Sequence, residues 1–138
     1  MNATTTQSIY PAVRYENARA AIAWLTSALG FEEHEICPGE GDSIAHAELS
    51  VGGNLIMLGS VKPDGMAQTP KRLGGITGTV YVALATAAEV DERYARVKKS
   101  AAEIVRELCD TDYGSREFSV RDPEGHVWSF GTYRPQST

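Results

Sequence analysis

Apolar and polar positions along the chain change their spacing several times, and the same order of changes occurs twice. In the first half, alternation over residues 9–15 predicts a strand, and apolar residues at helical spacing then predict a helix. Asn17 is a suitable N-cap for this helix and Gly30 a suitable stop. Further strands are predicted at 31–37, 43–51 and 54–58. The predicted order of elements in the first half is therefore βαβββ.

The second half repeats this order from Thr79 onward. Val80, Val82 and Leu84 alternate as in a strand, and the capping box Thr86-Ala87-Ala88-Glu89 precedes a second helix. Strands are predicted at 103–108, 115–121 and 126–132. Gly30 has no glycine counterpart, because Ala101 and Ala102 occupy the equivalent turn, where a left-handed alanine would cost about 1 kcal/mol.

Short identities support a duplication. Glu48-Leu49-Ser50-Val51 recurs as Glu117-Phe118-Ser119-Val120, and Glu35-Ile36-Cys37 recurs as Glu107-Leu108-Cys109. The repeat is longer than the roughly 20–50 residues of a solenoid unit, so it indicates a duplicated module. We predict an α+β fold of one domain, residues 1–138, with modules at 9–58 and 79–133. The linker between them, 60–77, is rich in Pro and Gly; a flexible crossover and a functional lid are both open interpretations.

Composition narrows the classes of partner. The 138 residues carry a formal net charge of −5, and the longest basic run is Lys98-Lys99, which disfavours nucleic acid. The sequence contains no run of about 18 apolar residues, so no membrane span is predicted. Residues 1–8 lack the basic start and apolar middle of a signal peptide. We therefore expect a cytoplasmic protein without a membrane or nucleic-acid partner.

Two segments carry a family resemblance. Tyr10-Pro11-Ala12-Val13-Arg14-Tyr15 leads into a helix ending Ala28-Leu29-Gly30-Phe31, and Arg121-Asp122-Pro123-Glu124-Gly125-His126-Val127-Trp128 lies near the end. Over residues 9–133 the chain resembles the vicinal oxygen chelate superfamily, which includes glyoxalase I, extradiol dioxygenases and bleomycin-resistance proteins. The resemblance implies a curved mixed sheet around a cup-shaped cavity, formed by two βαβββ modules. It also implies a homodimer.

Enzymes of that superfamily bind a metal in the cup, through one residue from the first and one from the last strand of each module. The matching positions here are Tyr10, Met57, Thr79 and Ser129. A phenol, a thioether and two hydroxyls are poor ligands for such a metal. The chain is therefore most similar to the metal-free, bleomycin-resistance-like branch, and we predict no metal, no cofactor and no catalytic residue.

Strand alternation assigns further residues to the cup. Arg14 and Tyr81 share a face with the four positions above, and the third strands add His46, Glu48 and Glu117. The predicted ligand-binding set is Tyr10, Arg14, His46, Glu48, Met57, Thr79, Tyr81, Glu117 and Ser129. His34 and His126 are placed at strand starts and are not included. The opposite face, with Trp128 and Phe130, is expected to pack on the helices.

The two equivalent carboxylates, Glu48 and Glu117, leave three interpretations open. They could neutralise a cationic ligand, act as acid and base in a proton transfer, or be solvated or paired with Arg14 and Arg116 at the rim of the cup.

Three functions follow from these interpretations. The preferred hypothesis is a small-molecule-binding protein of the glyoxalase/bleomycin-resistance type, which sequesters an aromatic or cationic ligand, as in antibiotic resistance, without a metal. The alternative is a superfamily enzyme, a lyase, isomerase or dioxygenase-like protein, that uses the cup carboxylates or an atypical metal. A third hypothesis is a protein-interaction module whose cup is filled by side chains.

Overall fold

A computed structural model describes residues 7–136 of the chain. The expectation that residues 1–8 are not a signal peptide therefore concerns a segment that lies mostly outside the described residues. The α+β fold with two βαβββ modules is confirmed. In chain order the elements are β1 (Ala12–Tyr15), α1 (Ala18–Leu29), β2 (Glu32–Pro38), β3 (Ile44–Val51), β4 (Asn54–Ser60), α2 (Pro70–Leu73), β5 (Val80–Ala83), α3 (Ala87–Lys99), β6 (Glu103–Asp110), β7 (Arg116–Arg121) and β8 (Val127–Gly131). No helix within residues 7–136 combines the length and the apolar character needed to cross a membrane.

Both long helices begin, and α1 also ends, where the sequence predicts. The side chain of Asn17 accepts a hydrogen bond from the amide of Ala20, and Gly30 ends α1 in the left-handed conformation with φ 77°. The side chain of Thr86 accepts from the amide of Glu89 at the start of α3. After α3, Ala101 adopts φ 59°, so this alanine does take up the costly left-handed geometry.

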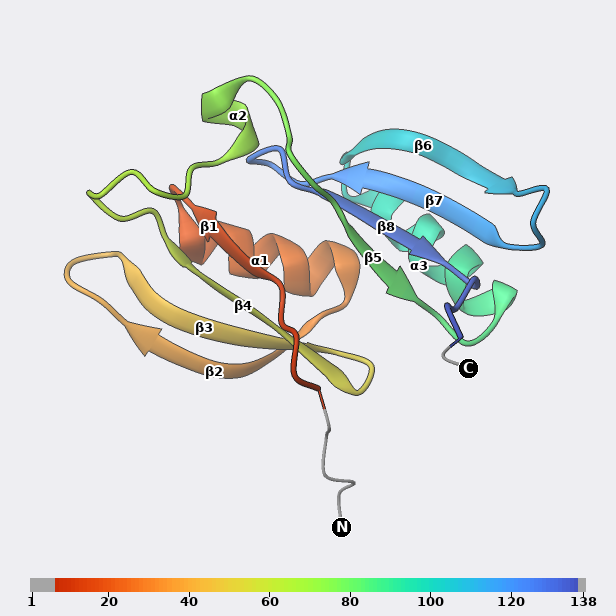
Figure 1. The fold of residues 1–138 in the computed structure, drawn as a ribbon, viewed down its shortest axis with the longest axis horizontal. Helices are drawn as coiled ribbons and strands as arrows, with labels where there is room; N and C mark the ends of the chain where they lie inside the picture. The colour runs from red at the N-terminus through yellow and green to blue at the C-terminus, as the bar shows by residue number, and fades with distance from the viewer. Residues whose placement is uncertain (1–6, 137–138) are drawn as a thin grey trace, which may run out of the picture.

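Each module forms a sheet of its own. The strand order is β1-β4-β3-β2 in the first sheet and β5-β8-β7-β6 in the second, as Figure 1 shows. β1 pairs with β4, and β5 with β8, in parallel, whereas the other neighbours are antiparallel. Ala12 opposes Met57 in the first sheet just as Tyr81 opposes Ser129 in the second. The parallel pairs therefore have equivalent registers. In the antiparallel pairs Glu48 opposes Met57 but Glu117 opposes Gly131, so the expectation that the two glutamates occupy equivalent positions is wrong.

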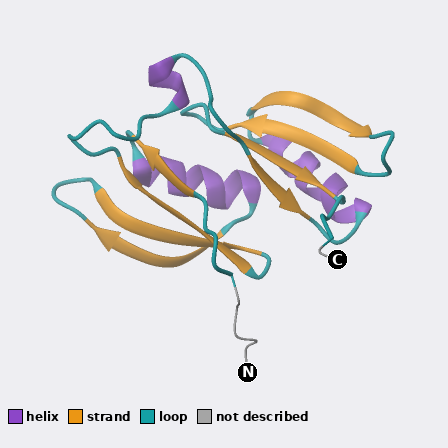
Figure 2. Cartoon of the chain, viewed as in Figure 1, coloured by secondary structure: helices purple, strands orange, loops and turns teal. Residues whose placement is uncertain are grey.

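The helices cover one face of each sheet, with α1 on the first and α3 on the second (Figure 2). Trp128 and Phe130 are fully buried in the resulting core, as predicted, and the ring of Phe118 stacks on Phe130. Burial of such aromatic side chains supplies much of the driving force for folding. Within residues 7–136, no helix lies on the opposite face of either sheet.

The turn between β7 and β8 joins the two modules. Glu124 accepts hydrogen bonds from the amides of Glu16 and Asn17, at the start of α1, at 2.6 and 2.8 Å. His126 contacts the carbonyl of Arg14 through Nε2 at 3.0 Å. A carboxylate at a helix N-terminus satisfies free N–H groups and favours the helix dipole. This turn, residues 122–126, is here called the joining turn.

The linker between the modules contains a short helix that the sequence analysis does not predict. The Thr69 side chain accepts from the amide of Arg72, and Pro70 occupies the first position of α2. The amide of Lys71 donates to the carbonyl of Glu124, which docks α2 on the joining turn. Four residues are too few to show helical periodicity, so only the cap and the proline signal this element.

Candidate functional site

The predicted site residues fall mainly into two groups on the helix-free faces. The N-terminal face is defined here as the helix-free face of the first sheet, with Arg14, His46, Glu48 and Met57. The C-terminal face is the helix-free face of the second sheet, with Tyr81, Glu117 and Ser129. Within residues 7–136, no hydrogen bond or ion pair joins one group to the other.

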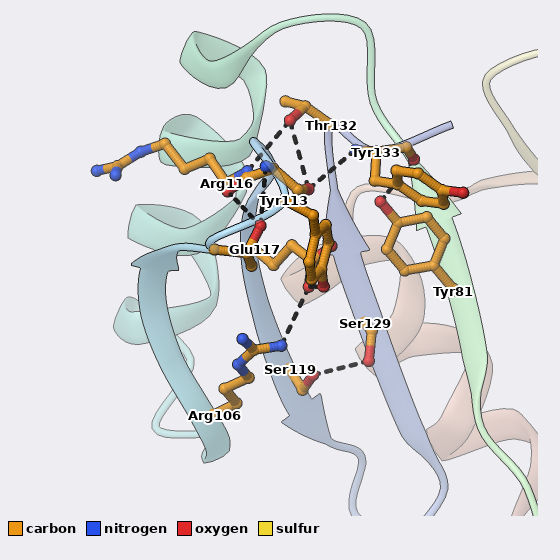
Figure 3. A network of polar contacts seen from close by, with 11 residues as sticks. Tyr81, Arg106, Tyr113, Arg116, Glu117, Ser119, Ser129, Thr132 and Tyr133 are labelled. Atoms are coloured by element: carbon orange, nitrogen blue, oxygen red, sulfur yellow. Dashed lines mark hydrogen bonds and ion pairs between the residues drawn. The ribbon is translucent and has the colours of Figure 1, made fainter. Parts of the chain in front are cut away.

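Glu117 is the charged group at the centre of the C-terminal face. Only 7% of the residue is exposed. Its Oε1 accepts a hydrogen bond from the Tyr113 hydroxyl at 2.9 Å and pairs with Nη1 of Arg106 at 3.1 Å (Figure 3). Among the described residues, all hydrogen bonds to this carboxylate reach Oε1. Oε2 therefore keeps acceptor capacity for a ligand.

A glycine beneath this carboxylate makes the arrangement possible. A Cβ atom at Gly131 would lie 2.6 Å from the Tyr81 hydroxyl oxygen, 2.6 Å from Cγ of Glu117 and 3.1 Å from its Oε2. Contacts this short are repulsive, so any other residue would displace one of the two side chains. Gly131 thus allows Tyr81 and Glu117 to converge above β8.

Three tyrosines surround Glu117 on the C-terminal face (Figure 3). The rings of Tyr113 and Tyr133 meet edge to face with centroids 5.8 Å apart, and the Tyr81 hydroxyl donates to the carbonyl of Tyr133 at 2.7 Å. All three are at least 37% exposed. Burial of its hydroxyl raises the pKa of Tyr81, and the nearby Glu117 charge adds to the rise, so the phenol stays protonated. Exposed rings that carry hydroxyls can both stack on a ligand and hydrogen-bond to it.

Sequence reasoning missed three members of this group: Arg106, Tyr113 and Tyr133. Tyr113 lies in the turn between β6 and β7, and Tyr133 follows β8, so strand alternation could not assign either to a face. Arg106 lies at a register shift of β6, which breaks the alternation locally. A usable signal existed for Arg106, because it directly precedes the repeated Glu-Leu-Cys segment, as His34 precedes Glu-Ile-Cys.

On the N-terminal face, two imidazoles contact one carboxylate. His46 Nε2 lies 2.8 Å from Oε2 of Glu48, and His34 Nε2 lies 3.8 Å from Oε1. The Glu48 side chain is 28% exposed and the two histidine side chains are more exposed. His34, which the sequence analysis sets aside, belongs to this group.

The interpretation in which the two carboxylates pair with Arg14 and Arg116 is contradicted by the structure. Arg14 instead donates from Nη1 to the carbonyl of Ser60 at 3.2 Å and lies over Gly59. Arg116 pairs with Asp91 and Asp110, at 2.6 and 2.9 Å. The reason is strand geometry, since Arg116 directly precedes Glu117 and therefore points to the opposite face of β7.

Two predicted site residues lie apart from these groups. The Tyr10 hydroxyl donates to the carbonyl of Gln7. Thr79 lines a groove of about 310 Å³ between β1 and β5. A larger groove of about 910 Å³ lies between the linker and the end of α3, next to Lys71 and Ala101. Neither Glu48 nor Glu117 lines either groove, whereas Arg14 lines the smaller one.

The residues at the family's metal positions do not fit a metal. The Tyr10 hydroxyl is engaged by Gln7, and the Ser129 hydroxyl by Ser119 at 2.7 Å. Met57 offers only a thioether, a soft ligand unsuited to the hard divalent ions. In the part of the chain that the structure describes, no group of three or more His, Cys, Asp or Glu residues is arranged to hold an ion. We derive no chemistry through a metal at these positions.

Comparisons with known proteins agree with this architecture. Residues 8–130 match the model of the glyoxalase/bleomycin resistance protein/dioxygenase superfamily. An uncharacterized protein of Mycobacterium bovis is 32% identical over 127 residues, which cover 90% of this chain and 82% of the relative. TioX from Micromonospora sp. ML1 superposes with a TM-score of 0.72 at 29% identity, over 96% of this chain and 100% of TioX.

A more distant structure shows the fold alone. FosX, a fosfomycin resistance protein from Listeria monocytogenes, has a TM-score of 0.66 at 14% identity, and 95% of each chain is covered. One conclusion follows from the duplicated βαβββ module, the two parallel strand pairs and the family match over nearly the whole chain. This chain belongs to the glyoxalase/bleomycin resistance protein/dioxygenase superfamily.

Proposed function

We propose that this protein binds a small organic molecule, aromatic or cationic, on its helix-free faces and sequesters it without using a metal. The observation that carries the proposal is the C-terminal face. There, three exposed tyrosines surround a buried carboxylate, and one oxygen of this carboxylate accepts no hydrogen bond from residues 7–136. A flat ligand ring can stack on the tyrosines, while a donor group of the ligand reaches Oε2 of Glu117.

The electrostatics of the C-terminal face favour a ligand that offers an uncharged hydrogen-bond donor to Glu117. Arg106 neutralises the charge of Glu117 through a direct ion pair. The Ser119 and Ser129 hydroxyls and the Tyr81 hydroxyl add hydrogen-bonding groups on β5, β7 and β8. Polar groups placed around an apolar or aromatic surface are typical of small-molecule sites.

The proposal includes a homodimer in the cytoplasm. A second subunit placed over a helix-free face would exclude water from the ligand. Native mass spectrometry of protein purified without chelators or a metal-affinity column measures subunit count, bound metal and any co-purified molecule together. A metal-free dimer supports the proposal, whereas one metal ion per subunit contradicts its metal-free part.

Titration with 1-naphthalenemethanol, followed by NMR of the backbone amides, tests ligand binding. We expect saturable shifts of amides on β7 and β8. Substitution of Tyr133 by Ala is expected to weaken binding about threefold to tenfold, because one aromatic contact is lost. Tyr10→Ala is the matched control, since Tyr10 lies apart from the C-terminal face, and it should leave the affinity unchanged. Absence of saturable binding on either face would refute the proposal.

A further inference from the structure

One row of directly opposed residues crosses the whole C-terminal face. Arg106 on β6 opposes Ser119 on β7, which opposes Ser129 on β8. Ser129 in turn opposes Tyr81 on β5. Glu117 lies two residues from Ser119 along β7 and therefore shares this face. The face thus carries a guanidinium at one end and a phenol at the other, with hydroxyls and a buried carboxylate between them (Figure 3).

The ion pair of Arg106 and Glu117 presents a donor beside an acceptor. Oε1 of Glu117 accepts from Nη1 of Arg106 and from the Tyr113 hydroxyl, whereas Oε2 accepts no hydrogen bond from residues 7–136. The side chain of Glu117 is 10% exposed, so a ligand that covers Oε2 without donating to it leaves a buried oxygen unsatisfied. A guanidinium carries five N–H groups, and the ion pair uses only Nη1 of a side chain that is 48% exposed. Further donors of Arg106 therefore remain for a ligand.

We infer that the C-terminal face recognises an aromatic amide, whose N–H donates to Oε2 of Glu117 and whose carbonyl accepts from Arg106. The inference rests on the proposed function, because it names the ligand class of the same site. It keeps the aromatic part of that class and excludes the cationic part from this face. An amide carries a donor and an acceptor side by side in one plane, which matches the acceptor and donor of the ion pair. The ring of the ligand stacks on the exposed tyrosines.

Arg106 is the residue that sets this specificity. Its guanidinium is charged at every physiological pH, so it neutralises Glu117 and repels the ammonium group of a ligand. A ligand carboxylate accepts from Arg106 but places a negative oxygen against Oε2 of Glu117, which is unfavourable. A neutral amide satisfies both side chains. Discrimination therefore comes from the like charges and unpaired groups that the other ligands leave in the site.

Three probes with the same naphthalene ring test the inference: 1-naphthamide, 1-naphthoate and 1-naphthylmethylamine. NMR titration at pH 7.5 measures each affinity from the shifts of backbone amides on β7 and β8. We expect 1-naphthamide to bind at least about tenfold more tightly than 1-naphthoate, because only the amide donates to Oε2 of Glu117. The amine should bind about fivefold more weakly than the amide, because Arg106 repels it.

Variants separate charge from hydrogen bonding. Arg106→Gln removes the charge and should lower the preference for the amide over the amine about fivefold, whereas Arg106→Lys keeps the charge and should still disfavour the amine. Glu117→Gln offers a donor in place of the carboxylate and should abolish the preference for the amide over 1-naphthoate. Arg121→Gln is the matched control, because Arg121 pairs with Glu103 across the same two strands at the other end of β7. It should leave all three affinities unchanged.

The results distinguish the inference from the proposed function. Suppose that 1-naphthalenemethanol binds on the C-terminal face, but the amide has no preference over 1-naphthoate, or Arg106→Gln changes the selectivity no more than Arg121→Gln. The inference is then wrong and the proposed function stands. If neither the alcohol nor the amide binds saturably on either face, both are wrong.

Discussion

The hydroxyl of Tyr15, in the first module, donates a hydrogen bond of 2.6 Å to Oδ2 of Asp122 in the second module. The indole N–H of Trp128 donates to the same oxygen at 3.0 Å. The other oxygen, Oδ1, accepts from the amides of Glu124 and His126. Asp122 is 4% exposed, so one buried carboxylate fixes the joining turn and both modules together.

Asp122→Ala is expected to lower the free energy of unfolding by about 3–5 kcal/mol, because it leaves several buried donors without an acceptor. Urea unfolding followed by tryptophan fluorescence measures the loss. Asp112→Ala, at an exposed position, is the control and should change stability by less than about 0.5 kcal/mol. Equal stability of the two variants would show that Asp122 does not hold the modules together.

Stability should fall in alkali through Tyr15. Burial raises the pKa of Tyr15 well above its ordinary value of 10.0, and the Asp122 carboxylate adds to the rise. Below pH 10 the phenol is protonated in the folded and unfolded chains alike, so its contribution is constant. Above that pH the unfolded chain loses the proton first, and the free energy of unfolding decreases as pH rises toward the folded pKa. Urea midpoints between pH 8 and 11 should decline less steeply in Tyr15→Phe than in the wild type.

Ala101→Gly should stabilise the protein by about 0.5–1 kcal/mol, because glycine adopts the observed φ of 59° without the steric penalty of a Cβ. Thermal unfolding measures the gain. Ala102→Gly is the control: Ala102 lacks a positive φ, and the change should be neutral or destabilising. A lower melting temperature for Ala101→Gly would contradict the expectation.

Gly131→Ala should reduce binding of 1-naphthalenemethanol on the C-terminal face at least about tenfold, since the added Cβ displaces Tyr81 or Glu117. Gly53→Ala is the matched control, because an added Cβ there meets nothing within 4 Å. NMR titration measures both affinities, and circular dichroism confirms that each variant is folded. Equal affinity in the two variants would show that the convergence above β8 has no role in binding.

Much of the fold could be predicted from the sequence, because its signals are local. Asn17, Gly30 and Thr86 act within one helical turn, and alternation along β4 and β8 correctly placed Trp128 in the core. Because the sequence is duplicated, the order of strands and helices predicted for the first half also applied to the second half. The short helix α2 escaped prediction because four residues carry too little periodicity.

The site was harder to predict from the sequence, because several of its contacts come from residues outside the regular alternation of the strands. Tyr113 reaches Glu117 from a turn, and Arg106 reaches it from a register shift. Alternation along a strand assigns a face to a side chain but not a partner, which is why the partners of Glu48 and Glu117 stayed open in the sequence and Arg14 and Arg116 were candidates. Partner choice depends on side-chain reach and local twist, which only the folded chain determines.

The joining turn also makes the two halves unequal in their tolerance of natural variation. In the first module the turn between β3 and β4 is Gly52-Gly53, where an added Cβ atom would meet nothing. In the second module the equivalent turn holds the first helix by its N-terminus and both modules through Asp122. Among homologues, insertions should therefore accumulate at the first of these turns and be excluded from the second.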